Sequence, residues 1–585
     1  MRNLKFSYLV LFILGTAVVM SCASLKKMKR DAGKVSYSVV PETLEAHNGK
    51  VDVSLQGRIP AKYFIKKATI VATPVLKTAE GEKFYEPYIL QGEKVKANNK
   101  VISYTQGGSV AYKGSIPFEY AMRKSELYLK IHATKGLKSL DFEPVKLANG
   151  VIATSTLVDN SPLSILGFQK SKNNTGVYDP SIDKFQRVVP DKYVADLIYL
   201  INSSEVRGKE MTKEELKTLS HYITEAYKAD RKELKGVEIS AYASPDGKLD
   251  FNTQLSQKRQ GTSSKVIEKD LAKNKVKTAL KTKYTPEDWD GFKEMMEKST
   301  IQDKELILRV LSMYADPEVR EREIKNLSAS FTAVANDILP KLRRAKITAS
   351  VDLIGRTDAE ISALALSDPS KLNQAELLYA ATLTNDPQVQ KTIYTSFTKI
   401  FADDWRGYNN LGSVNFGLGD SDSAASNFEK ADRLDPKNPI VQNNLGCIEL
   451  KKVNLAKAEE LFGAATGAGK EVHDNLGIVK IMQAQYETAT KLFTDDSQNA
   501  ANHALAQLLN NDNNGALRTL NAAAVETGRI AYLKAIIAAR TAKSSMLYEN
   551  LGNAVKKDAA YKELAKTDLE FAKYFDDQNF KLILQ

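Results

Sequence analysis

Hydrophobic and polar residues alternate in short runs through the first part of the chain. In segment 51–56, Val51, Val53 and Leu55 alternate with polar residues, and segment 127–132 repeats the pattern. An alternation of period two turns one face of a strand toward a core and the other toward solvent. Gly, Pro and Asn interrupt these runs at intervals of about 8–12 residues, which is typical of a β-sandwich. We expect a β-sandwich over 37–158, followed by a linker without periodicity over 159–184.

Strands and helices alternate in the middle of the chain. Strand-like apolar runs lie at 195–201, 237–242 and 345–354, and helical patterns follow the first two runs. This order predicts an α+β domain over 185–365. A long extra segment at about 283–343 contains a further helical run, so we interpret it as a helical insertion.

The second strand of this domain leads through a Pro-Asp-Gly turn into a helix. The segment reads VEISAYASPDGKLDFNTQLSQKRQ, in which Leu-Ser and a basic residue lie on the helix. Here the chain resembles the OmpA-like family, in which a turn Asp and a helix Arg hold diaminopimelate of peptidoglycan. The resemblance implies a peptidoglycan site at Ser244, which replaces the Asp, with Asp246 as its substitute and Arg259 as the basic residue. The alternative is an OmpA-like fold that no longer binds peptidoglycan.

Small and aromatic residues recur at a fixed spacing in the last part of the chain. The first unit has Gly412, Ala424, Phe428 and Ala431, the second has Gly446, Ala458, Phe462 and Ala465, and a third begins at Leu476-Gly477. Small residues let two helices approach, and an aromatic ring fills the groove between them. The period of about 34 residues is that of tetratricopeptide (TPR) repeats. We predict an all-α TPR superhelix over 372–575.

A row of polar residues precedes the Leu-Gly step of each repeat. The row contains Asn409, Asn410, Asn443, Asn444, Asp474 and Asn475. First helices line the concave side of such an array, where side-chain amides can hydrogen-bond the backbone of an extended peptide. We therefore expect these residues to bind a protein partner; the alternative is that some of them cap helices.

The beginning of the chain predicts export and a lipid anchor. A basic start and a short apolar run, 9–19, precede Cys22, and the sequence around Cys22 resembles a bacterial lipobox. The expected signal peptide is 1–21, with a lipid on Cys22 and a tether over 22–36. A lipidated Cys carries several acyl chains, which hold a protein at a membrane far more firmly than the marginal binding of a single chain. With only two cysteines in the chain, the mature protein has no intramolecular disulfide.

The residues that enzymes commonly use show no catalytic pattern. The five histidines are not spaced as metal ligands, and neither a nucleophile-elbow motif nor a phosphate-binding loop occurs. We expect a non-enzymatic protein without a cofactor or metal. The net charge of +12 permits contact with anionic surfaces, but export argues against nucleic acid.

The complete domain order resembles envelope lipoproteins of the Bacteroidota type. This resemblance implies an outer-membrane-anchored scaffold on the periplasmic face, with a protein partner in assembly or secretion and possible peptidoglycan contact. The alternative is a surface-exposed adhesin or glycan-capture accessory protein.

Overall fold

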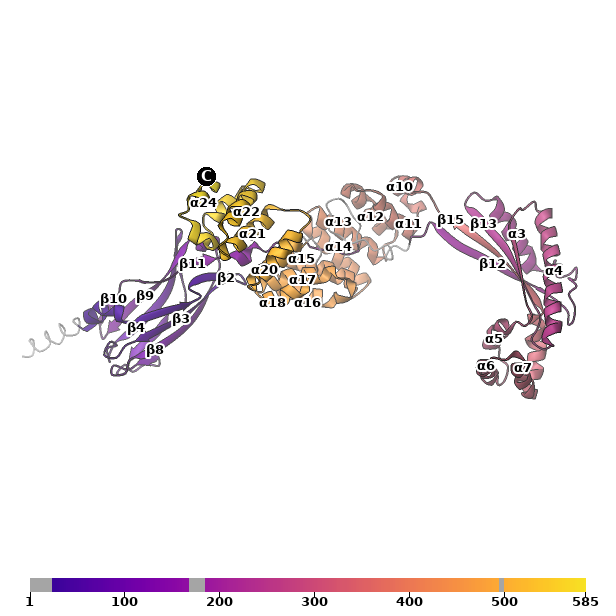
Figure 1. Ribbon diagram of the computed structural model, residues 1–585, viewed down its shortest axis with the longest axis horizontal. Coiled ribbons are helices and arrows are strands. Elements are labelled where there is room, and N and C mark those ends of the chain that lie inside the picture. Colours follow the sequence, from indigo (N-terminus) through magenta and orange to yellow (C-terminus); the bar gives the residue numbers. More distant parts are fainter. Residues whose placement is uncertain (1–23, 162, 168–184, 494–498) are drawn as a thin grey trace, which may run out of the picture. The chain divides into compact units, whose positions relative to one another are not determined.

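The computed structural model describes residues 24–161, 163–167, 185–493 and 499–585, without the side chains of 328–330. The predicted signal peptide, Cys22 and residues 168–184 lie outside this part. Two compact units are present: Met1–Ile182 with Thr384–Gln585, and Asp183–Leu383 (Figure 1). Within the described residues, no helix combines the length and the hydrophobicity needed to cross a membrane.

The predicted sheet-rich N-terminal region is confirmed. Its main strands are β1 (Ser36–Val40), β2 (Thr43–His47), β3 (Lys50–Ile59), β4 (Thr69–Thr78), β6 (Tyr88–Gly92), β7 (Lys100–Ile102), β8 (Gly108–Pro117), β9 (Ser125–Lys135) and β11 (Val145–Ile152). Strand β3 pairs with β1, β2 and β8. Strand β2 also pairs with β11, which begins a row of paired strands in the order β11-β9-β4-β6-β7. Val53 and Leu55 of β3 share one core with Leu129 of β9, as their alternation predicts.

The expected tether is folded onto this sheet region instead of forming a free linker. Residues 24–30 are helical, and the short helix Ala32–Lys34 leads into β1. Leu25 and Met28 are each only 2% exposed because they pack into the core of the sheet region. These two apolar side chains explain why the segment folds despite its many lysines.

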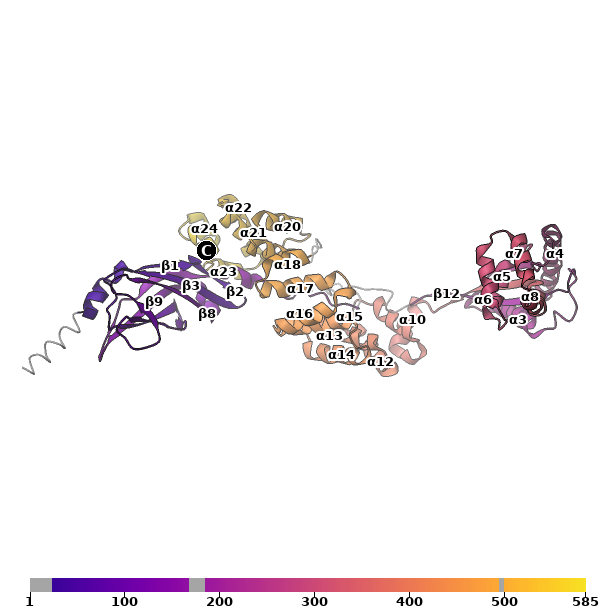
Figure 2. The same ribbon diagram turned by 90° about the horizontal axis from the view of Figure 1, so that it is seen from below.

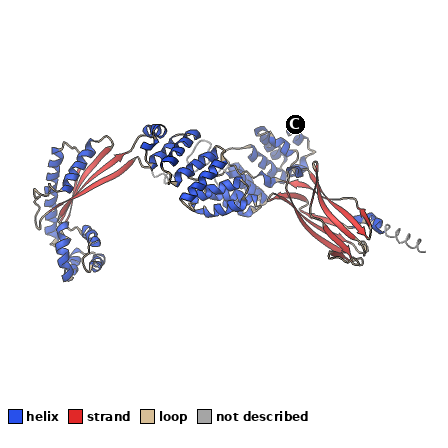
Figure 3. Cartoon of the chain, turned by 180° about the vertical axis from the view of Figure 1, so that it is seen from behind, coloured by secondary structure: helices blue, strands red, loops and turns tan. Residues whose placement is uncertain are grey.

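The C-terminal part is an array of helical hairpins (Figures 2 and 3). Its helices are α12 (Pro387–Ile400), α13 (Trp405–Gly417), α14 (Ser421–Leu434), α15 (Pro439–Lys451), α16 (Leu455–Ala464), α17 (Glu471–Met482), α18 (Tyr486–Leu492), α19 (Ala500–Leu509), α20 (Asn513–Ala522), α21 (Gly528–Arg540), α22 (Ser544–Lys557), α23 (Ala560–Ala565) and α24 (Gln578–Ile583). The helices pair from α13 with α14 to α21 with α22. The predicted all-helical repeat region is confirmed.

Three of the hairpins close because a glycine on the first helix faces a phenylalanine at the second. A Cβ at Gly412 or Gly446 would lie 2.6 Å from a ring carbon of Phe428 or Phe462. In the third repeat a Cβ at Gly477 would lie 2.8 Å from the ring of Phe493. The recurring glycine therefore provides the space that the aromatic ring fills.

The second unit is an α+β fold. Its sheet has the order β12-β15-β13-β14, from strands Val188–Ile198, Arg344–Ile354, Lys232–Tyr242 and Leu280–Thr285. Helices α3 (Glu214–Lys228) and α4 (Leu249–Lys273) share one core with this sheet. The helical insertion has its own core and consists of α5 (Trp289–Lys298), α6 (Lys304–Met313), α7 (Pro317–Asn326), α8 (Ser328–Asp337) and α9 (Leu339–Leu342).

Two boundaries differ from the sequence prediction. β14 overlaps the beginning of the segment that we interpreted as the insertion, because its residues LKTKYT have no apolar alternation to mark an edge strand. Helix α11 (Gln374–Ala380), which we assigned to the array, belongs to the α+β unit. The Nη1 atom of Arg356 donates to both carboxylate oxygens of Glu376 in this helix at 2.9 Å, which ties the helix to the end of the sheet.

Gly446→Ala should destabilise the array, because the added methyl group would collide with the ring of Phe462. We expect a loss of about 1–3 kcal/mol, the usual range for overpacking. The matched control is Gly552→Ala in α22, where a Cβ would meet no atom within 4 Å; there alanine should stabilise the helix by about 0.5–1 kcal/mol. Urea unfolding followed by helical circular dichroism measures both, and a stabilising Gly446→Ala would contradict this packing.

Candidate functional site

A segment that follows the sheet region lies in the groove of the helical array. We call Asp159–Gly167 the strap; all of it except Pro162 is described. The described residues of the strap form no helix, and they bond to first helices of the array, namely α13, α15, α17 and α19. The predicted linker over 159–184 is therefore wrong for its first part, which is bound in the groove with residues 163–166 buried.

Asparagine side chains bind the strap backbone in a two-point arrangement. Asn475 of α17 accepts from the N–H of Ser164 at 2.9 Å and donates to the carbonyl of the same residue at 2.9 Å. Asn444 of α15 binds Leu166 in the same way, at 2.8 and 2.9 Å. Each side chain thus satisfies both backbone groups of one strap residue.

The arrangement follows the repeat. Asn444 and Asn475 both stand directly before a Leu-Gly step, and they bind strap residues that are two positions apart. Farther along the groove, Asn502 of α19 accepts from the N–H of Asp159 at 3.1 Å and donates to its carbonyl at 2.8 Å. The strap therefore runs from later repeats toward earlier ones.

A second row of asparagines supports the first. Asn443 donates to the carbonyl of Ser164 at 2.8 Å, and Asn409 donates to that of Leu166 at 3.2 Å. The two rows are also joined: Asn475 donates to Asn443 at 2.9 Å, and Asn444 donates to Asn409 at 2.8 Å. All four asparagines are fully buried, so each amide orientation depends on its neighbours as well as on the strap.

Apolar side chains also hold the strap in the groove, in addition to these hydrogen bonds. Leu163, Ile165 and Leu166 are at most 4% exposed and belong to the same core as the repeat phenylalanines. Full burial of such a side chain contributes about 1.5–3 kcal/mol. Gly167 ends the described strap with φ +79°, and a Cβ there would lie 2.6 Å from the Asn409 amide nitrogen. Only glycine fits this close approach.

The structure corrects the expected role of the asparagine row. The predicted chemistry, side-chain amides on a peptide backbone, occurs, but the peptide belongs to the chain itself. Asp474 and Asn410, the remaining members of the row, are 5% and 7% exposed; Asp474 accepts from Asn499 at 3.3 Å. None of the six is a helix cap, because α13 and α15 begin after Asp404 and Asn438, and α17 after Lys470.

The groove remains open beyond the beginning of the strap. A cavity of about 570 Å³ is lined by Asp159 and by residues of α19, of α21 and of the loop between α20 and α21, with Asp558 and Tyr561 completing it. Arg529, 15% exposed, donates to Asn502 at 2.6 Å, but it is 4.0 Å from Asp159, and its buried Nε has no partner. Burial lowers the pKa of Arg529 to about 10. Arg529 and Asn502 could not be found from the repeat pattern, because their helices α21 and α19 lack the Leu-Gly step.

The sheet region also contacts the array directly. The His47 ring and the Tyr486 hydroxyl are 2.6 Å apart. Thr154 donates to Glu570 at 2.5 Å, and Arg540 of α21 donates to the same carboxylate at 2.8 Å. The chain is therefore fixed to the array shortly before the strap begins.

The predicted peptidoglycan site has a different arrangement from the expected one. Arg259 is 0% exposed, and its guanidinium donates to the carbonyls of Ser203, Tyr242 and Leu200 at 2.8–3.1 Å. Burial lowers its pKa to about 10. Arg259 is thus an internal support and does not face a ligand.

The other two residues of that site lie together at the turn before α4. The Ser244 hydroxyl donates to Asp246, and Arg343 contacts both side chains at 3.4 Å. Ser244 is 6% exposed. Arg343 directly precedes β15 and is far from this turn in the sequence, so no local pattern connects the two.

Side chains that could bind a metal ion are not grouped in the part of the chain that the structure describes. No group of three His, Cys, Asp or Glu side chains is placed to hold a metal ion there. Cys447 is fully buried beside the strap, and burial raises the pKa of its thiol. A raised thiol pKa keeps this cysteine protonated and unreactive.

A family model matches one repeat of the array. Residues 406–438 match the tetratricopeptide repeat family, and this segment spans α13 and α14. Such repeats define a class of protein–protein interaction scaffolds. No curated protein sequence matches this chain.

Several solved structures are similar to part of the chain. A tetratricopeptide repeat protein from Parabacteroides merdae is 14% identical, covering 42% of this chain and 98% of its own, with a TM-score of 0.29. PilW, a type IV pilus biogenesis factor, is 14% identical over 39% and 98%, with a TM-score of 0.28. YrrB, a TPR protein with an unusual peptide-binding site, is 18% identical over 30% and 97%, with a TM-score of 0.25.

Asn475→Leu should loosen the strap, because the N–H of Ser164 would be buried without an acceptor. The expected loss is about 1–3 kcal/mol of unfolding free energy. Asn427→Leu is the control, since Asn427 bonds Ser423 of its own helix at 2.7 Å and should change stability by less than about 0.5 kcal/mol. Equal stability of the two variants in urea unfolding would show that the amide does not hold the strap.

Arg259→Met should destabilise the α+β unit by at least about 3 kcal/mol, because it leaves three buried carbonyls without a donor. Arg343→Met should cost at most about 1 kcal/mol, since its side chain is partly exposed and its contacts are long. Of the two tryptophans in the chain, Trp289 lies in this unit, so its fluorescence in a Trp405→Phe background reports the unfolding. If Arg259→Met left the protein stable but abolished its binding to peptidoglycan, Arg259 would be a peptidoglycan-binding residue after all.

Proposed function

We propose that this protein is a lipid-anchored envelope scaffold that uses the TPR array both to fix its own domains and to bind a protein partner. The observation that carries the proposal is the two-point asparagine contact with the strap. It supports an array able to hold a peptide by its backbone. Because the strap fills the groove along α13, α15 and α17, the partner has to bind elsewhere.

The open end of the groove is the partner site in this proposal. The cavity beside Arg529 continues the surface on which Asn502 already binds a backbone. The unpartnered Nε of Arg529 favours a partner segment that presents a carbonyl or carboxylate there. Val525 at the rim is 71% exposed, so an incoming chain reaches the cavity without displacing the strap.

The anchor and location belong to the same proposal. Lipidation of Cys22 would attach the chain to the outer membrane, and we favour its periplasmic face with a role in assembly or secretion. The fold of residues 24–30 supports a short distance between the anchor and the sheet region. Surface display as an adhesin or glycan-capture accessory remains the alternative.

The central domain is OmpA-like in this proposal. Support comes from β13, the turn that follows it and α4, which have the order of the family's binding segment. A contact with peptidoglycan would then fall to Asp246 and Arg343, whose side chains are 24% and 13% exposed, and not to Arg259.

Photo-crosslinking in intact cells tests the partner site. A photoreactive residue at Val525 should give one discrete adduct with an envelope protein, whereas the same residue at Val453, 58% exposed on the array, should not. Arg529→Met should abolish the adduct while the helical unfolding transition persists, because Met fills a similar volume without a buried charge. No adduct at Val525, or equal adducts at both positions, would contradict the proposal.

A further inference from the structure

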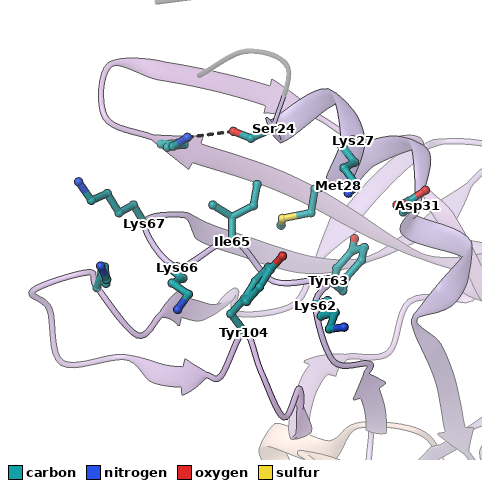
Figure 4. Close-up of a pocket in the computed structure, with 12 residues that line it drawn as sticks. Ser24, Lys27, Met28, Asp31, Lys62, Tyr63, Ile65, Lys66, Lys67 and Tyr104 are labelled. Carbon is teal, nitrogen blue, oxygen red and sulfur yellow. Dashed lines mark hydrogen bonds between the residues drawn. The ribbon is translucent and has the colours of Figure 1, made fainter. Parts of the chain in front are cut away.

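A cavity of about 430 Å³ opens in the sheet region next to the first described residue (Figure 4). The helical segment 24–30 forms one side of it, and the loop before β4 forms another. The lining residues are Ser24, Lys27, Met28, Asp31, Lys62, Tyr63, Ile65, Lys66, Lys67, Lys94, Tyr104 and Lys135. Half of them are lysines, which sets this cavity apart from an ordinary surface hollow.

The positive charge of this lysine pocket is not balanced by its own carboxylates. Asp31 is the one acidic residue in the lining, and it already contacts Arg30 and Lys34 at 3.5 and 3.4 Å. Lys66 pairs with Glu93 at 3.0 Å, and Lys135 donates to Ser24 at 2.9 Å.

Four other lysines keep free ammonium groups. Among the described residues, Lys27, Lys62, Lys67 and Lys94 take part in no ion pair. Like charges gathered around one hollow repel each other, and an anion with several oxygens would relieve that repulsion.

The interior of the lysine pocket is apolar. Met28, Tyr63, Ile65 and Tyr104 lie between the lysine stems in Figure 4. The ammonium of Lys66 lies 5.4 Å from the centre of the Tyr104 ring. An apolar interior below a cationic rim suits an amphiphilic anion better than a fully hydrated ion.

We propose that the lysine pocket binds the phosphate of an anionic ligand, and that a phospholipid headgroup is its source. Lysine ammonium groups are compact point charges that suit phosphate. Each basic residue near an anionic membrane contributes attraction as well.

The position of the pocket agrees with a lipid ligand. Cys22 precedes Ser24 by two residues, and two residues span at most about 7 Å. If Cys22 carries the lipid of the proposed function, the pocket opens within one lipid headgroup of the membrane surface. The phosphate site itself does not depend on that anchor, because its charges and lining come from residues 24–135.

Calorimetric titration of the detergent-solubilised full chain with dihexanoyl phosphatidic acid tests the inference. We expect one binding site. Lys27→Gln with Lys94→Gln should weaken binding at least about tenfold, because two charge-assisted contacts are lost. Lys50→Gln with Lys113→Gln removes the same charge from exposed positions of the same sheet region and should leave the affinity unchanged.

Two further titrants identify the source. Dihexanoyl phosphatidylcholine should bind much more weakly than phosphatidic acid. If inorganic phosphate competes only weakly with phosphatidic acid, the ligand is the lipid headgroup. If inorganic phosphate bound as strongly as the lipid, the site would be assigned to free phosphate. No binding of phosphatidic acid, equal binding of phosphatidylcholine, or an unchanged affinity of the Lys27/Lys94 variant would overturn the proposal. A short-chain lipid needs no anchor, so a missing lipid on Cys22 would not alter these results.

Discussion

Backbone groups that are buried outside helices and sheets need hydrogen-bond partners, and the TPR array supplies them to the strap through asparagine side chains. An amide is the one neutral side chain that donates and accepts with the geometry of a peptide group. A buried amide that met only apolar atoms would destabilise the fold. Asn443, Asn444 and Asn475 are fully buried, so the array and the strap each satisfy polar groups of the other.

This interaction also limits where the protein binds other molecules. Leu163, Ile165 and Leu166 pack into the core of the array, so the proposed function places the partner at the open end near Arg529. The sheet region is held twice, by the strap and by contacts such as His47 with Tyr486. The array therefore acts as an internal support for the strap and for the sheet region.

Much of the fold could be predicted because it depends on local spacing. Alternation revealed β3 and β9, and the interval between Gly412 and Gly446 revealed the hairpins, since a ring fits only where Cβ is absent. The identity of the bound peptide could not be predicted, because periodicity does not tell which segment fills a groove. The apolar run LSILG within a polar stretch was the available signal. Likewise, no sequence pattern distinguishes an Arg259 that faces a ligand from one that faces three carbonyls.

Hydrogen exchange of the strap backbone tests the central claim most directly. The N–H groups of Ser164 and Leu166 are bonded to Asn475 and Asn444 in the groove. Their exchange should be slow and should match that of buried amides in α15 and α17, because they open only when the array opens. Exchange of both N–H groups at the rate of an unprotected peptide, in a protein whose helices stay protected, would show that the groove is empty.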